Sequence, residues 1–153
     1  MKPLFYAVVL CGALAASVQA ASVQAAPAPD PALAPFAQFI DAMNAGKTAQ
    51  AAATYAPSVT IIDEFGPHIW NSFSGWAGDL GTSFKTDGVT DFHIALSPVS
   101  FKNVDAKAGY GVAPATLTFK LKGKPTTEKG LFTFTTAKEA NGWRVTGWAW
   151  STL

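Results

Sequence analysis

The chain has 153 residues and a mass of 16.0 kDa, a length that suits one domain and hardly two. Charged residues make up only 14% of it, whereas it carries 11 Phe and 5 Trp, so the composition excludes intrinsic disorder. Eleven basic against ten acidic residues give a net charge of +1, which offers no electrostatic basis for binding nucleic acid or an anionic membrane surface.

The N-terminal segment has the pattern of a secretory signal peptide. Lys2 gives it a basic start, and residues 4–16 form an apolar run that is too short to span a bilayer. Small residues suited to cleavage follow within Ala20–Ala26. We therefore expect residues 1–26 to be removed and the mature protein to be periplasmic or secreted. An uncleaved membrane anchor is the alternative.

Processing would change both the cysteine count and the charge. Cys11 is the only cysteine, and Lys2 is the only charged residue within residues 1–26. The mature chain would therefore be neutral and free of thiols. Disulfides, Cys-ligated zinc and thiol catalysis are then excluded together.

A proline-rich stretch separates this segment from the rest. Four of the nine residues from 27 to 35 are proline, whose fixed φ and missing N–H favour an extended spacer. We expect a linker over residues 27–34 and one domain over residues 35–153.

Helical patterns come first in that domain. Apolar residues recur at i, i+3, i+4 and i+7 from Phe36 to Met43, which predicts a helix that begins at Pro35 and ends near Asn44. An alanine-rich segment predicts a second helix over residues 48–55. A third is predicted over residues 75–84, with an apolar stripe formed by Trp76, Leu80 and Phe84.

Strands follow the third helix. One short β segment is predicted before that helix, at residues 58–63. After the helix, apolar and polar residues alternate with a period of two at residues 92–96, 117–121, 130–136 and 143–150. Turn signals lie at Gly123-Lys124 and Asn141-Gly142. Helices followed by hairpin-linked strands predict an α+β fold with N-terminal helices packed on a curved antiparallel sheet.

Three stretches carry a family resemblance: Phe39 to Gly46, Tyr55 to Gly66, and Asn141 to Trp150, which includes Asn-Gly-Trp-Arg-Val and Trp-Ala-Trp. In this order they resemble the NTF2-like superfamily, especially its SnoaL-like and ketosteroid-isomerase-like members. The resemblance covers residues 35–153 and implies a cone in which a bent sheet wraps around helices and leaves a pocket at its open end. It also implies a homodimer formed through the outer face of the sheet.

The resemblance implies chemistry at Asp63. The isomerases carry a general-base aspartate after the first β segment, and Asp63 falls on that position. Their two oxyanion donors are not matched, because Phe39 stands where they have a tyrosine and the strand at residues 130–136 offers only threonines. An oxyanion hole is commonly the largest single catalytic contribution, so steroid isomerisation is not implied.

The residues themselves also make Asp63 the leading catalytic candidate. A carboxyl at the end of an apolar strand that faces a pocket would be desolvated, and its raised pKa would suit proton transfer near neutral pH. The alternative is that Asp63 or Glu64 caps the turn before Gly66. His93 and His68 are candidate assisting groups, against the simpler reading of each as a solvent-facing residue.

We expect a mostly apolar pocket for a small hydrophobic molecule, because aromatic residues exceed what a small core needs. Its expected lining is Phe39, Tyr55, Trp70, Tyr110 and Trp148. No cofactor is expected, and Asp63, Glu64, His68 and His93 match no known metal-ligand spacing. The leading hypothesis is ligand binding, with isomerase- or lyase-type proton transfer if the protein is an enzyme. The alternative is a non-catalytic dimeric interaction module.

Overall fold

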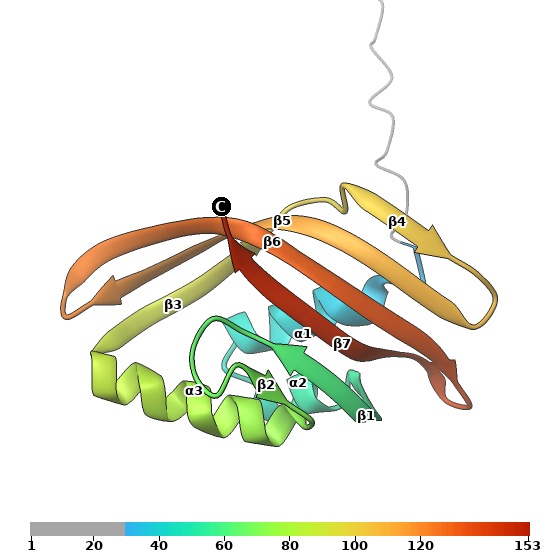
Figure 1. Ribbon diagram of the computed structural model, residues 1–153, viewed down its shortest axis with the longest axis horizontal. Helices are drawn as coiled ribbons and strands as arrows, with labels where there is room; N and C mark the ends of the chain where they lie inside the picture. The colour runs from blue at the N-terminus through green and yellow to red at the C-terminus, as the bar shows by residue number, and fades with distance from the viewer. Residues whose placement is uncertain (1–29) are drawn as a thin grey trace, which may run out of the picture.

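The computed structural model describes residues 30–153, so the predicted signal peptide and the first residues of the predicted linker lie outside it. Three helices lie against the concave side of one curved sheet (Figure 1). The helices are α1 (Ala34–Asn44), α2 (Thr48–Ala52) and α3 (Phe73–Asp87). The strands are β1 (Tyr55–Ile62), β2 (Ile69–Trp70), β3 (Val89–Leu96), β4 (Phe101–Val104), β5 (Ala108–Leu121), β6 (Lys124–Glu139) and β7 (Gly142–Thr152).

The sheet has the order β2-β1-β7-β6-β5-β3, and β4 pairs with the other end of β5. Its long strands β5, β6 and β7 are joined by tight hairpins, as the turn signals predict. All pairs are antiparallel except β1 with β7, which run parallel. Parallel neighbours need a long crossover connection, and the helices and the rest of the sheet provide it here because they lie between β1 and β7 in the chain. The predicted α+β class with helices on a curved, largely antiparallel sheet is confirmed.

Helix α1 supplies the centre of the core. The predicted apolar stripe is buried, with Phe36, Phe39 and Ile40 at most 1% exposed. The ring of Phe36 stacks on Phe134 of β6 at 4.1 Å between centroids. Burial of such rings contributes about 2–3 kcal/mol each relative to exposure, so this contact anchors the helix to the sheet.

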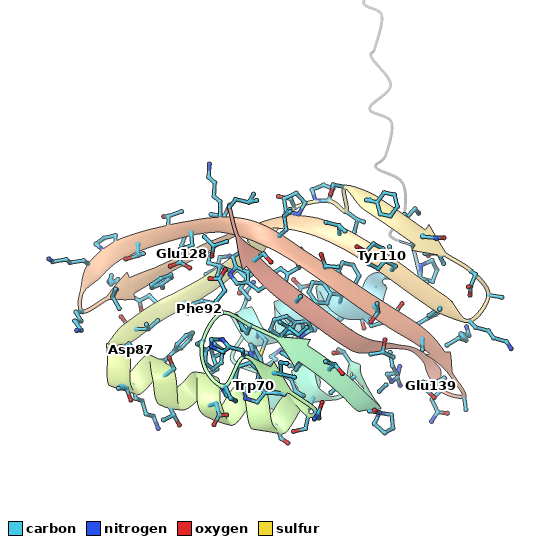
Figure 2. All side chains as sticks on the ribbon, in the orientation of Figure 1. Trp70, Asp87, Phe92, Tyr110, Glu128 and Glu139 are labelled. Carbon is cyan, nitrogen blue, oxygen red and sulfur yellow. The ribbon has the colours of Figure 1, made fainter. Side chains whose placement is uncertain are left out.

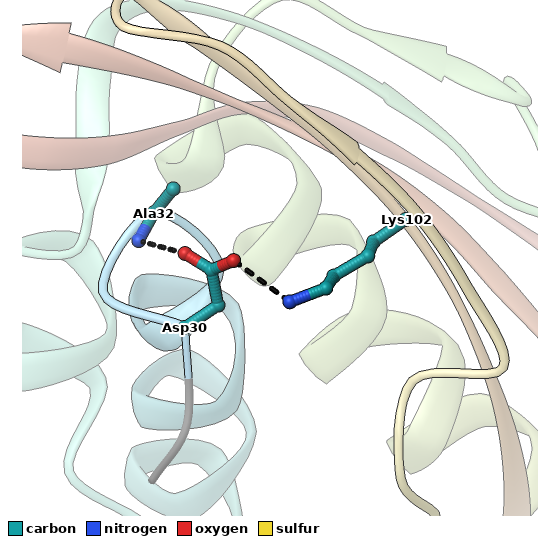
Figure 3. A network of polar contacts seen from close by, with 3 residues as sticks. All are labelled: Asp30, Ala32 and Lys102. Carbon is teal, nitrogen blue, oxygen red and sulfur yellow. Dashed lines mark hydrogen bonds and ion pairs between the residues drawn. The ribbon is translucent and has the colours of Figure 1, made fainter. Parts of the chain in front are cut away.

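The packed domain begins earlier than residue 35. Ala32 and Leu33, which the sequence analysis assigns to the linker, are 2% and 6% exposed. Asp30 holds this start in place, since its carboxylate accepts a hydrogen bond from the Ala32 N–H and pairs with Lys102 of β4 at 2.9 Å (Figure 3). The Lys102 ammonium and the backbone bond keep the pKa of Asp30 below its usual value.

The second helix is shorter than predicted. It ends at Ala52, and Tyr55 already belongs to β1. Pro57 lies within β1 at an exposed position where the pairing with β7 is irregular, so its missing N–H removes no ladder bond that a regular pair would need. Tertiary pairing with β7 therefore overrides the local helical preference of the alanine-rich segment.

Helix α3 is longer than predicted at both ends. The Ser72 hydroxyl accepts a hydrogen bond from the Gly75 N–H and caps its start. Gly88 closes it with φ +72°, a left-handed conformation that glycine adopts without a steric penalty. Among residues 30–153, no helix is both long and apolar enough to cross a membrane.

Two β-bulges change which side chains point inward. In β7 the pairing with β6 shifts between Thr135 and Thr136, which leaves Thr146 as an extra residue. Val145 and Trp148 consequently both face the core, although strict alternation would put them on opposite faces. Strict alternation would put Arg144, Thr146, Trp148 and Trp150 on one face, and the bulge divides this set.

Candidate functional site

A cavity of about 250 Å³ lies at the α3 end of the concave face. Its walls come from α3 and from strands β3, β5, β6 and β7, and Phe39 of α1 and the segment directly after β1 complete it. Most of its lining is apolar, as the sequence analysis expects of a ligand pocket. The lining residues are Phe39, Asp63, Glu64, Phe65, Trp76, Leu80, Ser83, Phe84, Val89, Phe92, Ile94, Leu117, Phe119, Glu128, Phe132, Trp148 and Trp150.

The second bulge shapes the wall that β3 provides. The pairing of β3 with β5 shifts between Thr90 and His93, and Asp91 takes a positive φ of 55° at that point. Val89 and Phe92 can then both face the cavity. The side chain of Phe92 lies between its own strand, β3, and α3, where the ring packs on Phe84 (Figure 2).

Asp63 brings a carboxylate to this cavity. It follows the last residue of β1, where the chain leaves the sheet. One carboxylate oxygen accepts a hydrogen bond from the Trp76 indole N–H at 2.9 Å, and the other accepts one from the Glu64 N–H at 2.8 Å. The indole of Trp76 is itself buried on α3, so the carboxylate is held in a fixed orientation.

Burial raises the pKa of Asp63 above its usual value, and the negative charge of Glu64 adds to the increase. The hydrogen bonds from Trp76 and from the Glu64 N–H oppose it, because they stabilise the carboxylate. Desolvation is the largest of these effects, so the pKa is raised on balance. A carboxyl of this kind is a better proton acceptor than an exposed aspartate.

Two more carboxyls line the rim of the cavity. Both carboxylate oxygens of Glu64 are bonded by Thr152 at the end of β7, one by its N–H and the other by its hydroxyl at 2.7 Å. Glu128 lies on the inward face of β6 (Figure 2). Desolvation and the charge of Glu64 raise the pKa of Glu128 above its usual value.

The structure does not bring the two histidines to this cavity. His93 lies opposite Thr118 on the exposed face of the sheet, because Phe92 and Ile94 take the inward positions of β3. It therefore does not meet Asp63. His68 lies in the loop after Asp63, and its exposed ring lies 3.3 Å from the backbone oxygen of Asp63, not from the carboxylate. Neither ring lines the cavity.

The five predicted lining residues divide into two groups. Phe39 and Trp148 line the cavity. Tyr55 lies behind Trp148 and accepts a hydrogen bond from its indole N–H at 2.7 Å, and burial raises the pKa of Tyr55. Trp70 packs behind Phe65. Tyr110 lies on the outer side of the sheet beside Phe101 (Figure 2), since the inward phase of β5 is taken by glycines and alanines there.

Sequence reasoning missed Trp76 and Glu128 as site residues. Trp76 is identified as part of an apolar stripe, but only the tertiary structure shows that its N–H reaches Asp63. Glu128 has the same phase along β6 as Phe132 and Phe134, so alternation extended toward the turn could have found it. The strand predicted from the sequence begins at residue 130, so Glu128 lies outside the predicted strand.

Within the described part of the chain, no three His, Cys, Asp or Glu side chains gather in the way a metal site requires. Asp63, Glu64 and Glu128 line one cavity, but Asp63 is committed to Trp76 and Glu64 to Thr152. The chemistry that the site offers is therefore that of carboxyl groups in an apolar enclosure.

The fold of the chain is similar to that of solved NTF2-like structures, a fold also described as cystatin-like. LinA is one such structure, with a TM-score of 0.68 and 14% identity over 80% of this chain and 84% of LinA. A ketosteroid isomerase-like protein from Erwinia carotovora atroseptica has a TM-score of 0.65 and 19% identity over 80% of this chain and 94% of that one. An NTF2-like superfamily protein from Salmonella enterica serovar Typhimurium has a TM-score of 0.65 and 14% identity over 78% and 86%.

These likenesses confirm the NTF2-like fold that the sequence resemblance implies. These similarities concern the fold alone, because the sequence identities between this chain and those structures are low. No protein-family model matches the chain, and no curated protein matches it by sequence.

Proposed function

We propose that this domain binds a small, mostly apolar molecule in the α3-end cavity and that Asp63 exchanges a proton with it. The observation that carries the proposal is the placement of the Asp63 carboxylate, oriented by the Trp76 indole N–H, in the wall of a mostly apolar cavity. A side chain with a raised pKa in such a place can accept a proton from carbon or oxygen.

The fold supports this proposal by analogy, since one structural neighbour is described as ketosteroid isomerase-like. The wall contributed by α1 is apolar at Phe39, so no hydroxyl donor from that helix faces the bound molecule. We therefore propose isomerase- or lyase-type proton transfer on a small, mostly apolar substrate, not steroid isomerisation in particular.

Binding can be tested with 2-tetralone, a small neutral bicyclic ketone, by isothermal titration calorimetry. We expect the wild-type protein to bind it and Leu80→Trp to lose binding, because Leu80 lines the cavity and an indole would fill it. Leu121→Trp is the matched control, since Leu121 is exposed and lies outside that lining. Equal binding by the two variants would contradict a ligand site in this cavity.

Proton transfer can be tested with the same ketone by following deuterium incorporation next to its carbonyl in heavy water. We expect the wild-type protein to accelerate exchange and Asp63→Asn to abolish the acceleration. Asp79→Asn is the control, because Asp79 accepts the Trp70 indole N–H at 2.8 Å in the same way but does not line the cavity. If both variants exchange like the wild type, Asp63 is not the proton acceptor.

We also propose that the protein is exported and that residues 1–26 are removed. The basic start, the short apolar run and the small residues near Ala20–Ala26 support this. Mass spectrometry of the protein recovered from the periplasm or medium would give the mature N-terminus. Recovery of the full-length chain in the cytoplasm would contradict export.

We also propose that the protein forms a homodimer through the outer face of the sheet. Its support is the exposed aromatic pair of Phe101 and Tyr110, whose ring centroids lie 6.0 Å apart on that side. Sedimentation velocity tests it, and a monomer at all concentrations would contradict both the dimer and the simplest form of an interaction module.

A further inference from the structure

The ionisable side chains that line the cavity are all of one kind. Every ionisable side chain that lines it within residues 30–153 is a carboxyl, namely Asp63, Glu64 and Glu128. The ion pairs found in that part of the chain, Lys102 with Asp30 and Lys120 with Asp91, lie away from it. Among the described residues, no cationic side chain therefore lines the cavity beside these three carboxyls.

Two of these carboxyls lie on adjoining parts of the rim. Glu64 is bonded to Thr152, and Thr152 is the β7 partner of Gly130. Glu128 lies two residues before Gly130 on β6, with its side chain on the same inward face. Like charges at such positions repel each other, and the charge of Glu64 indeed contributes to the raised pKa of Glu128.

Glu128 also has unused capacity to bind. No hydrogen bond or ion pair to its carboxylate exists among residues 30–153, whereas both oxygens of Glu64 are occupied by Thr152. Glu128 is half-buried, and partial desolvation makes its charged form less favourable, so a cation placed beside the carboxylate would stabilise that form.

Aromatic rings flank this rim. The ring of Trp150 lies directly over Gly130, where a Cβ atom would collide with it, and it packs on Phe132 at 4.7 Å between centroids. Both residues line the cavity. Ring faces next to carboxylates attract cations, and indole attracts them most strongly.

We propose that the ligand of this cavity carries a protonated amine on a small apolar skeleton, with the ammonium at the Glu64–Glu128 rim. The apolar part lies among the aromatic side chains toward Asp63. A carboxylate or phosphate ligand would be repelled by three carboxyls, and a neutral alcohol would gain only the apolar contacts. The inference rests on the proposed ligand-binding function of the same cavity and specifies its ligand.

The test uses three ligands with one ring system, namely 2-(1-naphthyl)ethylamine, 2-(1-naphthyl)ethanol and 1-naphthylacetate. Calorimetry at neutral pH should show the amine binding about tenfold more tightly than the alcohol, as expected for one charge-assisted contact, and the acetate binding most weakly. Added salt should weaken amine binding and leave alcohol binding unchanged. The salt series uses the wild-type protein, so it does not depend on the folding of a variant.

Glu128→Gln should weaken amine binding about tenfold and leave alcohol binding within about twofold. Glu139→Gln is the matched control, because Glu139 lies at the opposite end of β6, is exposed and does not line the cavity (Figure 2). It removes the same charge from the same strand and should change neither affinity.

Equal affinities of the wild type for the amine and the alcohol would overturn this inference and leave the ligand cavity standing. So would equal effects of Glu128→Gln and Glu139→Gln on amine binding. If neither 2-tetralone nor any naphthyl ligand binds, the proposed function fails, and the inference fails with it.

Discussion

The two ends of the concave sheet face are built from the same strands but differ in packing. At the α1 end, Phe36 fills the space against β6, and its side chain is fully buried. At the α3 end, Leu80 and Phe84 are only half-buried and a cavity remains. The inward positions of β6 change accordingly from Phe134 at one end to the carboxyl of Glu128 at the other.

This difference shows that an aromatic surplus serves two purposes in one small domain. Rings at the α1 end stabilise the fold, whereas rings at the α3 end enclose space that α3 does not fill. Closely packed cores are sensitive to loss of volume, and a wall that borders an existing cavity is less so. Four predictions test this distinction.

The largest effect is expected at the closed end. Phe36→Ala should lower the free energy of unfolding by about 3–5 kcal/mol, because it leaves a cavity beside Phe134 that cannot collapse. Phe84→Ala at the open end should cost about 1–2 kcal/mol, since its ring is already half-exposed. Urea denaturation measures both, and equal losses would show that the two ends are packed alike.

Gly130 lies at the open end, between the cavity-lining residues Glu128 and Phe132 of β6. A methyl group there would collide with the Trp150 ring and the Ser151 carbonyl, so Gly130→Ala should destabilise the protein by about 1–3 kcal/mol. It should also displace Trp150 from the cavity wall and weaken ligand binding. Gly78→Ala on α3 is the control, because its Cβ position is open and it should not be destabilised. If the stability and ligand binding of Gly130→Ala equal those of the wild type, Trp150 can move without a cost in free energy.

A smaller effect is expected for Trp76→Phe. The phenyl ring keeps most of the packing but removes the N–H that binds Asp63, at a cost of about 1 kcal/mol. Loss of that bond should raise the pKa of Asp63 further, because the bond favours the carboxylate. NMR titration of the Asp63 carboxyl measures it. Trp70→Phe, which loses the bond to Asp79, should leave the Asp63 titration unchanged.

The smallest effect concerns the pH dependence of stability. The pKa of Asp63 is raised in the folded state, so the folded protein holds this proton in a pH range where the unfolded chain has released it. Stability therefore falls as pH rises from the ordinary aspartate pKa of about 4 through the raised pKa of Asp63. Asp63→Asn should remove this part of the decline, and thermal unfolding at several pH values would show it. A steeper decline in the variant would reverse the sign and contradict a desolvated carboxyl.

Local patterns predict much of the fold because they act over few residues. The stripe from Phe36 to Met43 gives α1 almost residue for residue, and Asn141-Gly142 locates the last hairpin. The predicted helix at residues 48–55 is wrong at its end, where Tyr55 pairs with Val145 of β7. That contact joins residues far apart in the chain, and no local preference reports it.

The candidate site is predictable only in part for the same reason. Asp63 is identified because it follows an apolar strand in a recognisable order of elements, and the structure places it in the cavity wall. His93 and Tyr110 face outward, which alternation alone cannot decide without knowing the side on which the helices pack. The partner of Asp63 is Trp76, thirteen residues later on a helix whose distance from the strand depends on the whole packing.

The sequence by itself predicted the α+β fold class, most of the helices and hairpins, and the Asp63 carboxyl, because periodicity and turn chemistry are local properties of the chain. Tertiary structure decided which faces are inside. The bulges near Asp91 and at Thr146 reverse the alternation, and the hydrogen bonds from Thr152 hold Glu64 at the rim that Glu128 also lines. The balance of charge at that rim depends on long-range placement, which no spacing in the sequence encodes.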